Sequence, residues 1–174
     1  WAGKESAFKT VSKLLGSPPP FQHPSFRIEI SPGRPDSPIL EGIARYLDLV
    51  LPLRGEPGVA ALHALSWTAP AGGAAPEVRL GMAPAPERTP EWRPTLRARF
   101  SAREWACVSH EASALTRLAA RQAMASAIGV EEARLEIICR TGHPGRRIPL
   151  VLLDGKETAV DLSLSHHGRF LAWA

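Results

Sequence analysis

The sequence predicts an α+β protein with two lobes, each a long helix packed on a small, mostly antiparallel sheet. A segment with helical periodicity at 1–15 is followed by a short segment in which apolar and polar residues alternate, as in a strand. A longer helical segment at 101–128 is followed by several further strand-like segments. The stretch between them is rich in alanine and proline and has no regular period. We therefore expect three parts, namely a first lobe at 1–69, a crossover at 70–98 and a second lobe at 99–174.

The first lobe is expected to begin with the helix over 1–15, which Gly16 would end. A strand should follow at 26–30, where apolar and charged residues alternate. The segment 39–51 is ambiguous, because its apolar residues fit a helical stripe that Pro52 would end.

A strand is favoured at 58–68, because its apolar side chains share one parity. His63 has the same parity, so we expect a buried, hydrogen-bonded histidine there rather than a ligand. Within the crossover, a short strand is expected at 77–82.

The second lobe should open on the long helix at 101–128. Ser101 followed three residues later by Glu104 is a capping box, and Gly129 is a C-terminal stop. The expected core stripe consists of Leu115, Leu118, Ala119, Met124 and Ile128. Three or four strands should follow, at 134–140, 148–153, 160–164 and 170–173, with turns at His143-Pro144-Gly145 and Asp154-Gly155.

The composition is that of a globular protein, with 44% hydrophobic and 22% charged residues in 174. The formal charge of +4 and the pI of about 9.6 suit acidic partners such as phosphates, nucleic acid or an acidic protein surface, without choosing among them. The high proline content, 17 residues, indicates long connections between elements.

Cys107 and Cys139 could form at most one bridge, and their spacing is not typical of zinc or redox sites. Reduced thiols in the cytosol are the simplest interpretation. No run approaches 18 apolar residues and no signal peptide is evident. We therefore expect a soluble, cytoplasmic protein without a membrane partner.

The N-terminal run from Trp1 to Lys9 reads W-A-G-K-E-S-A-F-K. On a helix, Glu5 and Lys9 share one face, and Lys4 lies beside them. An acid near two ammonium groups can hold a metal ion, a phosphate or both. The alternative is an ordinary i,i+4 ion pair on a solvated surface, worth a few tenths of a kcal/mol.

A second polar stretch lies near the C-terminus, where Ser163-Leu164-Ser165-His166 closes an alternating strand. Together the two stretches resemble the phosphopantetheinyl transferases of the holo-acyl-carrier-protein synthase type. That family is marked by a W-x-x-K-E-x-x-x-K helix and by an S-x-S-H turn at a strand end. The resemblance covers both ends of the chain well and the middle loosely, and it implies two α/β lobes of the transferase type.

The resemblance implies transfer of the 4′-phosphopantetheine arm of coenzyme A to a serine of an apo acyl or peptidyl carrier protein, as in fatty acid, polyketide or peptide synthesis. Such phosphoryl transfer needs Mg²⁺ on the pyrophosphate, cations around the phosphates and a base for the hydroxyl. Glu5 would be a metal ligand and part of the base machinery, and Lys9 would meet the phosphate with Lys4 beside it. Ser165 and His166 would contact the phosphates of the ADP half, particularly the 3′-phosphate.

Further arginines are candidates for the nucleotide by their positions in the family's pattern. They precede a predicted strand, lie on the second lobe's helix, or follow the serine–histidine motif: Arg146, Arg147, Arg117, Arg121 and Arg169. Arg117 and Arg121 are four apart and therefore adjacent on a helix. For each arginine, a solvated surface charge is an equally good interpretation.

One departure from the family stands out. The family carries a Gly-x-Asp motif upstream of the lysine–glutamate helix, which provides the other Mg²⁺ ligands, and no such motif with its context occurs here. In the second lobe, Arg121-Gln122 occupies the place where a second copy of the Lys-Glu pair could have stood, so this lobe supplies no further acid. We expect either that an N-terminal segment has been removed or that the chain binds coenzyme A without efficient transfer.

Two other functions are compatible with the sequence, and a third is not. A noncatalytic member of the same fold would bind coenzyme A or a carrier protein without the metal site. A basic nucleic-acid-binding module is a distant third, since only the pI supports it. A Ser/His/Asp hydrolase is excluded, because Asp161, Ser165 and His166 lie on one strand and turn and cannot form a triad.

Overall fold

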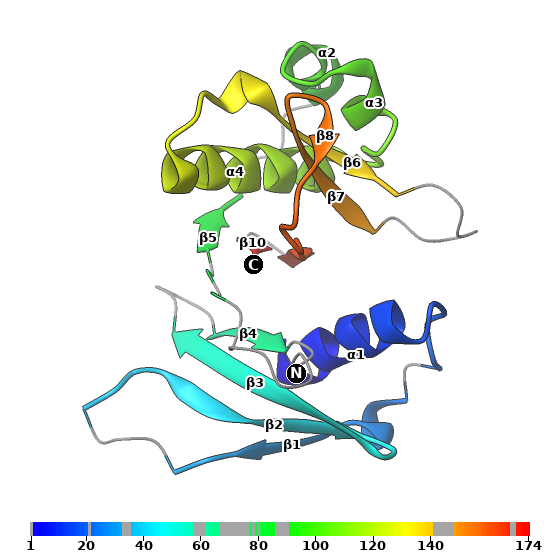
Figure 1. Cartoon of the computed structure of the whole chain (residues 1–174), viewed down its shortest axis with the longest axis vertical. Helices are drawn as coiled ribbons and strands as arrows, with labels where there is room; N and C mark the ends of the chain where they lie inside the picture. The colour runs from blue at the N-terminus through cyan, green and yellow to red at the C-terminus, as the bar shows by residue number, and fades with distance from the viewer. Residues whose placement is uncertain are drawn as a thin grey trace. The chain divides into compact units, whose positions relative to one another are not determined.

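The computed structural model describes the chain over residues 2–20, 22–32, 36–57, 62–66, 77, 79, 81–85, 91–140, 148–167 and 170–174. Over these residues the fold has four α-helices and three small antiparallel sheets, which confirms the α+β class. The chain divides into two compact units, Trp1–Leu80 (unit 1) and Gly81–Ala174 (unit 2), each labelled by its elements in Figure 1.

The described residues of unit 1 form one α-helix and one four-stranded sheet. Helix α1 spans Ala2–Leu14, and Gly16 just beyond it takes the positive φ expected of a helix stop. A short 3-10 turn at His23–Ser25 leads into the sheet. The strands are paired in sequence order and are β1 (Arg27–Ile30), β2 (Leu40–Tyr46), β3 (Leu49–Pro57) and β4 (Leu62–Ser66).

The core of unit 1 lies between α1 and the sheet (Figure 1). Ala7 and Val11, four apart on one face of α1, are fully buried against residues of the sheet. Phe26 is fully buried too, stacks on Tyr46 at 4.7 Å and meets Phe8 edge-on at 6.1 Å. These aromatic contacts fix the point at which the chain leaves the 3-10 turn and enters β1.

The helical interpretation of 39–51 was wrong, because the chain forms the β2–β3 hairpin there. Its turn is at Leu47, whose φ of 50° a helix does not allow. A side-chain carbon at Gly42 would lie 2.1 Å from the Glu29 carbonyl oxygen, so only glycine admits this close approach of β1. Pro52 does not end an element but lies inside β3, opposite Ile43.

In unit 2, the part of the chain that the structure describes forms three α-helices and two three-stranded sheets. The helices are α2 (Trp92–Arg97), α3 (Ala102–Trp105) and α4 (Glu111–Ile128). One sheet has the order β5-β10-β9, with β5 (Gly81–Pro84), β9 (Leu164–His167) and β10 (Phe170–Trp173). The other is β6-β7-β8, with β6 (Leu135–Cys139), β7 (Pro149–Leu153) and β8 (Lys156–Glu157).

The single long helix expected at 101–128 is divided into two helices. The Ser101–Glu104 capping box is present in full, but it begins only the four-residue α3. The chain then turns, and His110 starts α4 by accepting a hydrogen bond from the Ser113 N–H through its Nδ1. At the other end, Gly129 has the left-handed conformation expected of a C-terminal stop.

Helix α4 joins the two sheets of unit 2, because it packs on β9 and β10 and also on β6. Their shared apolar core contains Ala120, Ala125, Leu135, Ile137, Val151 and Leu162. The turn at Asp154-Gly155 is present, and both residues have positive φ. The strand expected at 160–164 is displaced, since β9 begins only at Leu164; the predicted turn at His143-Pro144-Gly145 lies outside the described residues.

Candidate functional site

The N-terminal motif lies on α1, as its spacing predicts. Glu5 and Lys9 form an i,i+4 ion pair, with Lys9 Nζ 3.1 Å from Glu5 Oε1, and about a third of each side chain is exposed. Lys4 is half-buried on the same helix. The three residues therefore share one element, and Glu5 already has a cationic partner.

The described residues do not form a metal-binding cluster, and the expected Mg²⁺ stays a prediction. Mg²⁺ favours octahedral oxygen ligation, usually from carboxylates together with waters and substrate phosphates. Across the described ranges, no three His, Cys, Asp or Glu side chains gather in one place. Glu5 is the single acid of its motif, and its carboxylate is paired with Lys9, so this motif offers a metal one carboxylate that already has a cationic partner.

The second motif lies within a strand instead of a turn. Ser165 and His166 belong to β9 and pair with Ala172 and Leu171 of β10. Reciprocal backbone hydrogen bonds between Ser163 and Ala174, of 2.9 and 3.1 Å, extend the pairing by one position. In a strand, successive residues point to opposite faces of the sheet, so Ser165 and His166 do not share a face.

His166 is exposed and meets a histidine that the sequence did not single out. Its ring lies edge-on to the His110 ring, with centroids 4.6 Å apart. Because His110 also caps α4, this contact connects the serine–histidine strand to the N-terminal end of the helix. The signal available in the sequence was the position of His110 just before an acidic, helix-forming run.

Arg117 and Arg121 are buried, not solvated. With Ser113 they form a polar stripe at i, i+4 and i+8 on α4, and each of the three is less than 8% exposed. The Nη1 of Arg117 donates to Ser113, at 3.2 Å to the carbonyl oxygen and 2.6 Å to Oγ, and its Nη2 lies 3.6 Å from the sulfur of Cys139. Within the described part of the chain, the Nε of Arg117 has no hydrogen-bond partner.

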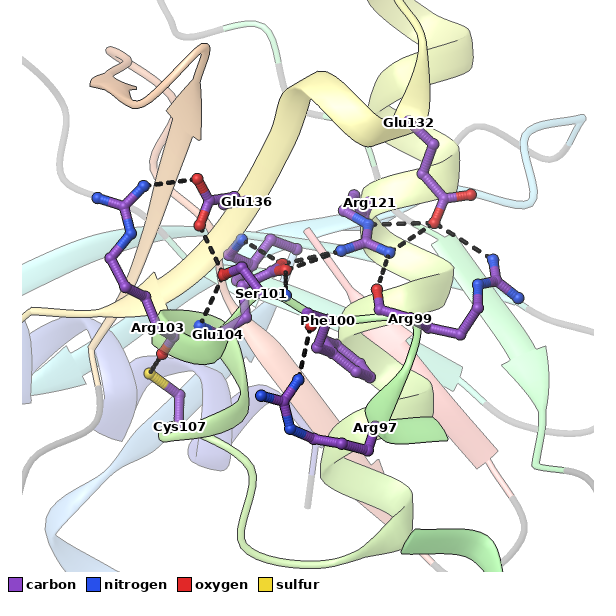
Figure 2. Close-up of polar contacts among 11 residues, drawn as sticks. Arg97, Arg99, Phe100, Ser101, Arg103, Glu104, Cys107, Arg121, Glu132 and Glu136 are labelled. Atoms are coloured by element: carbon purple, nitrogen blue, oxygen red, sulfur yellow. Dashed lines mark hydrogen bonds and ion pairs between the residues drawn. The ribbon is translucent and has the colours of Figure 1, made fainter. Parts of the chain in front are cut away.

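Arg121 is the centre of a buried ion-pair network (Figure 2). Its Nη1 donates to both carboxylate oxygens of Glu104 at 3.0 Å, and its Nε and Nη2 donate to Glu132 at 3.1 and 2.7 Å. Nη2 also donates to the Arg99 carbonyl oxygen, and the guanidinium lies over the Phe100 ring. Every nitrogen of the guanidinium thus has a partner inside unit 2, and a phosphate-binding role for Arg121 stays a prediction.

Glu104 is the acid at the centre of the same network and is 1% exposed. Besides Arg121, it accepts hydrogen bonds from the backbone N–H of Ser101 at 3.0 Å and of Ile137 at 2.9 Å. One carboxylate therefore begins α3, ties it to β6 and neutralises a cation on α4. A charge buried this deeply persists only when its partners are complete.

We expect the stability of unit 2 to fall in acid partly through Glu132. Burial alone would raise its pKa, but the hydrogen bond and charge of Arg121, helped by Gln122 and Arg99, hold the pKa below its ordinary value. This contribution is complete above the unfolded carboxyl pKa of about 4.3 and is lost as the pH falls through the lower folded-state value. Urea unfolding between pH 6 and pH 3 should show the loss, and Glu132→Gln should flatten that part of the profile; equal slopes in both proteins would contradict it.

The other predicted cations, Arg146, Arg147 and Arg169, lie outside the described residues. The backbone of His63 is in β4, but its side chain is outside them too. Among the helices that the structure describes, none has the length and apolar character needed to cross a membrane. No family model, curated protein or solved structure matches this chain.

Proposed function

We propose that this chain transfers the 4′-phosphopantetheine arm of coenzyme A to a serine of an apo acyl or peptidyl carrier protein. The observation that carries the proposal is the exposed His166 on β9, whose ring contacts His110, the cap of α4. An imidazole at the N-terminal end of an 18-residue helix is a favourable place for an anion, because the helix dipole adds to the hydrogen bonds.

The residues of the two motifs would act on different groups of the substrates. The carrier serine hydroxyl attacks the β-phosphate of coenzyme A, and 3′,5′-ADP leaves. His166 donates a hydrogen bond to the 3′-phosphate. Ser165, which the resemblance also assigns to the phosphates, points to the other face of β9 and takes no part in this contact. Lys9, with Lys4 beside it, offsets the charge on the transferring phosphate, and Glu5 serves as base toward the carrier hydroxyl.

A noncatalytic coenzyme A- or carrier-binding protein is the second candidate, and one observation favours it. The Glu5 carboxylate, the acid on which the chemistry depends, is already paired with Lys9 at 3.1 Å. Such a protein would bind coenzyme A with or without Mg²⁺ and would not turn it over. The nucleic-acid module has only the net charge of +4 behind it.

The test is transfer of isotope from coenzyme A labelled in its pantetheine arm to an apo carrier protein, with Mg²⁺ present. The proposal expects label on the carrier, none when the carrier serine is replaced by alanine, and a loss of at least about tenfold in Lys9→Gln. Lys13→Gln is the matched control, since Lys13 follows four residues later on α1, outside the motif, and should leave the rate unchanged. Binding of coenzyme A without transfer would select the noncatalytic candidate. Absence of both binding and transfer would overturn both candidate functions.

A further inference from the structure

We propose that an acidic segment of another protein docks on α2 and α3, where two arginines lie on a pair of tryptophans. Trp92 of α2 and Trp105 of α3 pack together, with ring centroids 6.0 Å apart. The guanidinium of Arg93 lies over the Trp92 ring, 5.3 Å from its centroid, and that of Arg97 lies over the Trp105 ring at 5.7 Å. These four residues form the arginine–tryptophan surface, and none of them is assigned to coenzyme A.

The core of unit 2 holds this surface in place. Both indoles are half-buried and pack against the apolar cluster of Phe100, Ala114 and Leu118. Arg97 is held at a second point, because its Nη1 donates to the Phe100 carbonyl oxygen at 2.9 Å, as drawn in Figure 2. Since the side chains are already ordered, a partner that binds them loses little affinity to side-chain entropy.

The two arginines differ from the other exposed arginines that the structure describes in unit 2. Each of the others forms an ion pair with a carboxylate: Arg99 with Glu132, Arg103 with Glu136, Arg134 with Asp154 and Arg140 with Glu157. Arg93 and Arg97 are exposed as well, and among the described residues no carboxylate pairs with either. A guanidinium over an aromatic face keeps its full charge. Carboxylates of a partner would therefore complete both arginines.

The chemistry of the surface favours a protein over a nucleic acid or a membrane. Single-stranded nucleic acid binds by stacking bases on open aromatic faces, but here an arginine lies over each indole and the indoles pack on each other. Glu91, exposed and directly before α2, would repel a phosphate backbone or an anionic bilayer. Arginine and tryptophan are, by contrast, the residue types most enriched at the energetic centres of protein–protein interfaces.

The spacing of the arginines indicates how the partner presents its acids. Arg93 and Arg97 are four residues apart on α2, which corresponds to a rise of about 6 Å along the helix axis. Two acidic side chains four apart on another helix are neighbours at a similar distance. Each carboxylate can accept two parallel hydrogen bonds from one guanidinium. The expected partner is therefore a helix with two Asp or Glu residues one turn apart.

The test is an NMR titration of the isotope-labelled chain with an alanine-rich helical peptide that carries two glutamates four residues apart. We expect the indole N–H signals of Trp92 and Trp105 to shift, with a Kd of about 1 mM or tighter at low salt. About 1 M salt should weaken the binding at least about threefold. The same peptide with both glutamates replaced by glutamine should bind at least about tenfold more weakly, because the charge-assisted hydrogen bonds are lost.

Variants of the chain show whether the two arginines carry the binding. Arg93→Gln and Arg97→Gln should each raise the Kd of the glutamate peptide about three- to tenfold. Arg93→Lys should recover only part of the loss, because an ammonium lacks the guanidinium fork. Arg134→Gln is the matched control, since it removes the same charge from an exposed arginine that is already paired with Asp154, and it should change the Kd less than about twofold.

The result with Arg93→Gln is decisive should Arg97→Gln fail to fold, because the described residues give Arg93 only its contact with Trp92. Absence of binding, equal binding of the two peptides, or equal weakening by Arg93→Gln and Arg134→Gln would overturn the proposal. A single-stranded oligonucleotide or phosphatidylglycerol vesicles that shift the same indole signals at lower concentration than the glutamate peptide would overturn it as well.

Discussion

Replacing Glu104 by glutamine is expected to lower the free energy of unfolding of unit 2 by about 3 kcal/mol, since one partner of a buried ion pair is lost. The amide is nearly isosteric, so packing is preserved and the effect is electrostatic. Arg121 keeps Glu132 as a partner but loses its two-oxygen contact with Glu104. Urea unfolding followed by tryptophan fluorescence measures the loss, because Trp92 and Trp105 pack together in unit 2.

The matched control is Glu29→Gln, the same chemical change at an exposed ion pair. Glu29 bonds to Arg45 at 2.8 Å, but 54% of the Glu29 side chain is in solvent. Exposed pairs of this kind contribute about 0–1 kcal/mol, so the control should change stability by less than about 1 kcal/mol. Similar losses in the two variants would show that burial of the Glu104–Arg121 pair does not organise unit 2.

Phe26→Ala is expected to destabilise unit 1 by about 3–5 kcal/mol, because it removes a fully buried ring and leaves a cavity. The lost ring stacks on Tyr46 and meets Phe8 edge-on, so the α1–sheet core loses its central contact. Urea unfolding by circular dichroism gives the magnitude. Hydrogen exchange should place the effect in β1 to β3, with the amides of β6 and β7 unchanged.

Ile30→Ala is the control for this prediction, since Ile30 is a large apolar residue of the adjoining strand that is 49% exposed. It should cost less than about 1.5 kcal/mol, as only half of its side chain leaves an apolar environment. An equal loss for Ile30→Ala and Phe26→Ala would contradict the assignment of Phe26 to the core.

Local signals in the sequence were enough to predict several elements. Helix α1 and its stop at Gly16, the stop of α4 at Gly129 and the turn at Asp154-Gly155 were all found from residue types and short spacings. In each case glycine or a periodic apolar face determines the conformation without help from distant residues. The overall α+β class follows from the same local patterns.

Other elements depend on pairing partners that a local pattern does not show. The apolar spacing in 39–51 fits a helix, but pairing with β1 and β4 makes it a hairpin. The break before α4 escaped notice because its cap is a histidine, which is uncommon at that position.

In the candidate site, too, contacts within one element were predictable from the sequence and contacts between distant segments were not. The Glu5–Lys9 pair was predictable, since both residues lie on one helix. The contact of His110 with His166 and that of Arg121 with Glu104 join distant segments. The burial of Arg117 likewise requires the packed unit, because its sequence neighbours do not reveal what covers α4.

The most direct test of the proposed function is calorimetric titration of coenzyme A and of dephospho-coenzyme A, which lacks the 3′-phosphate, into the chain and into His166→Ala. We predict that the unmodified chain binds coenzyme A at least about tenfold more tightly than the dephospho form, as expected for one charge-assisted hydrogen bond. His166→Ala should lose this preference while binding the dephospho form as before. Absence of coenzyme A binding, or a preference that survives in His166→Ala, would contradict the account.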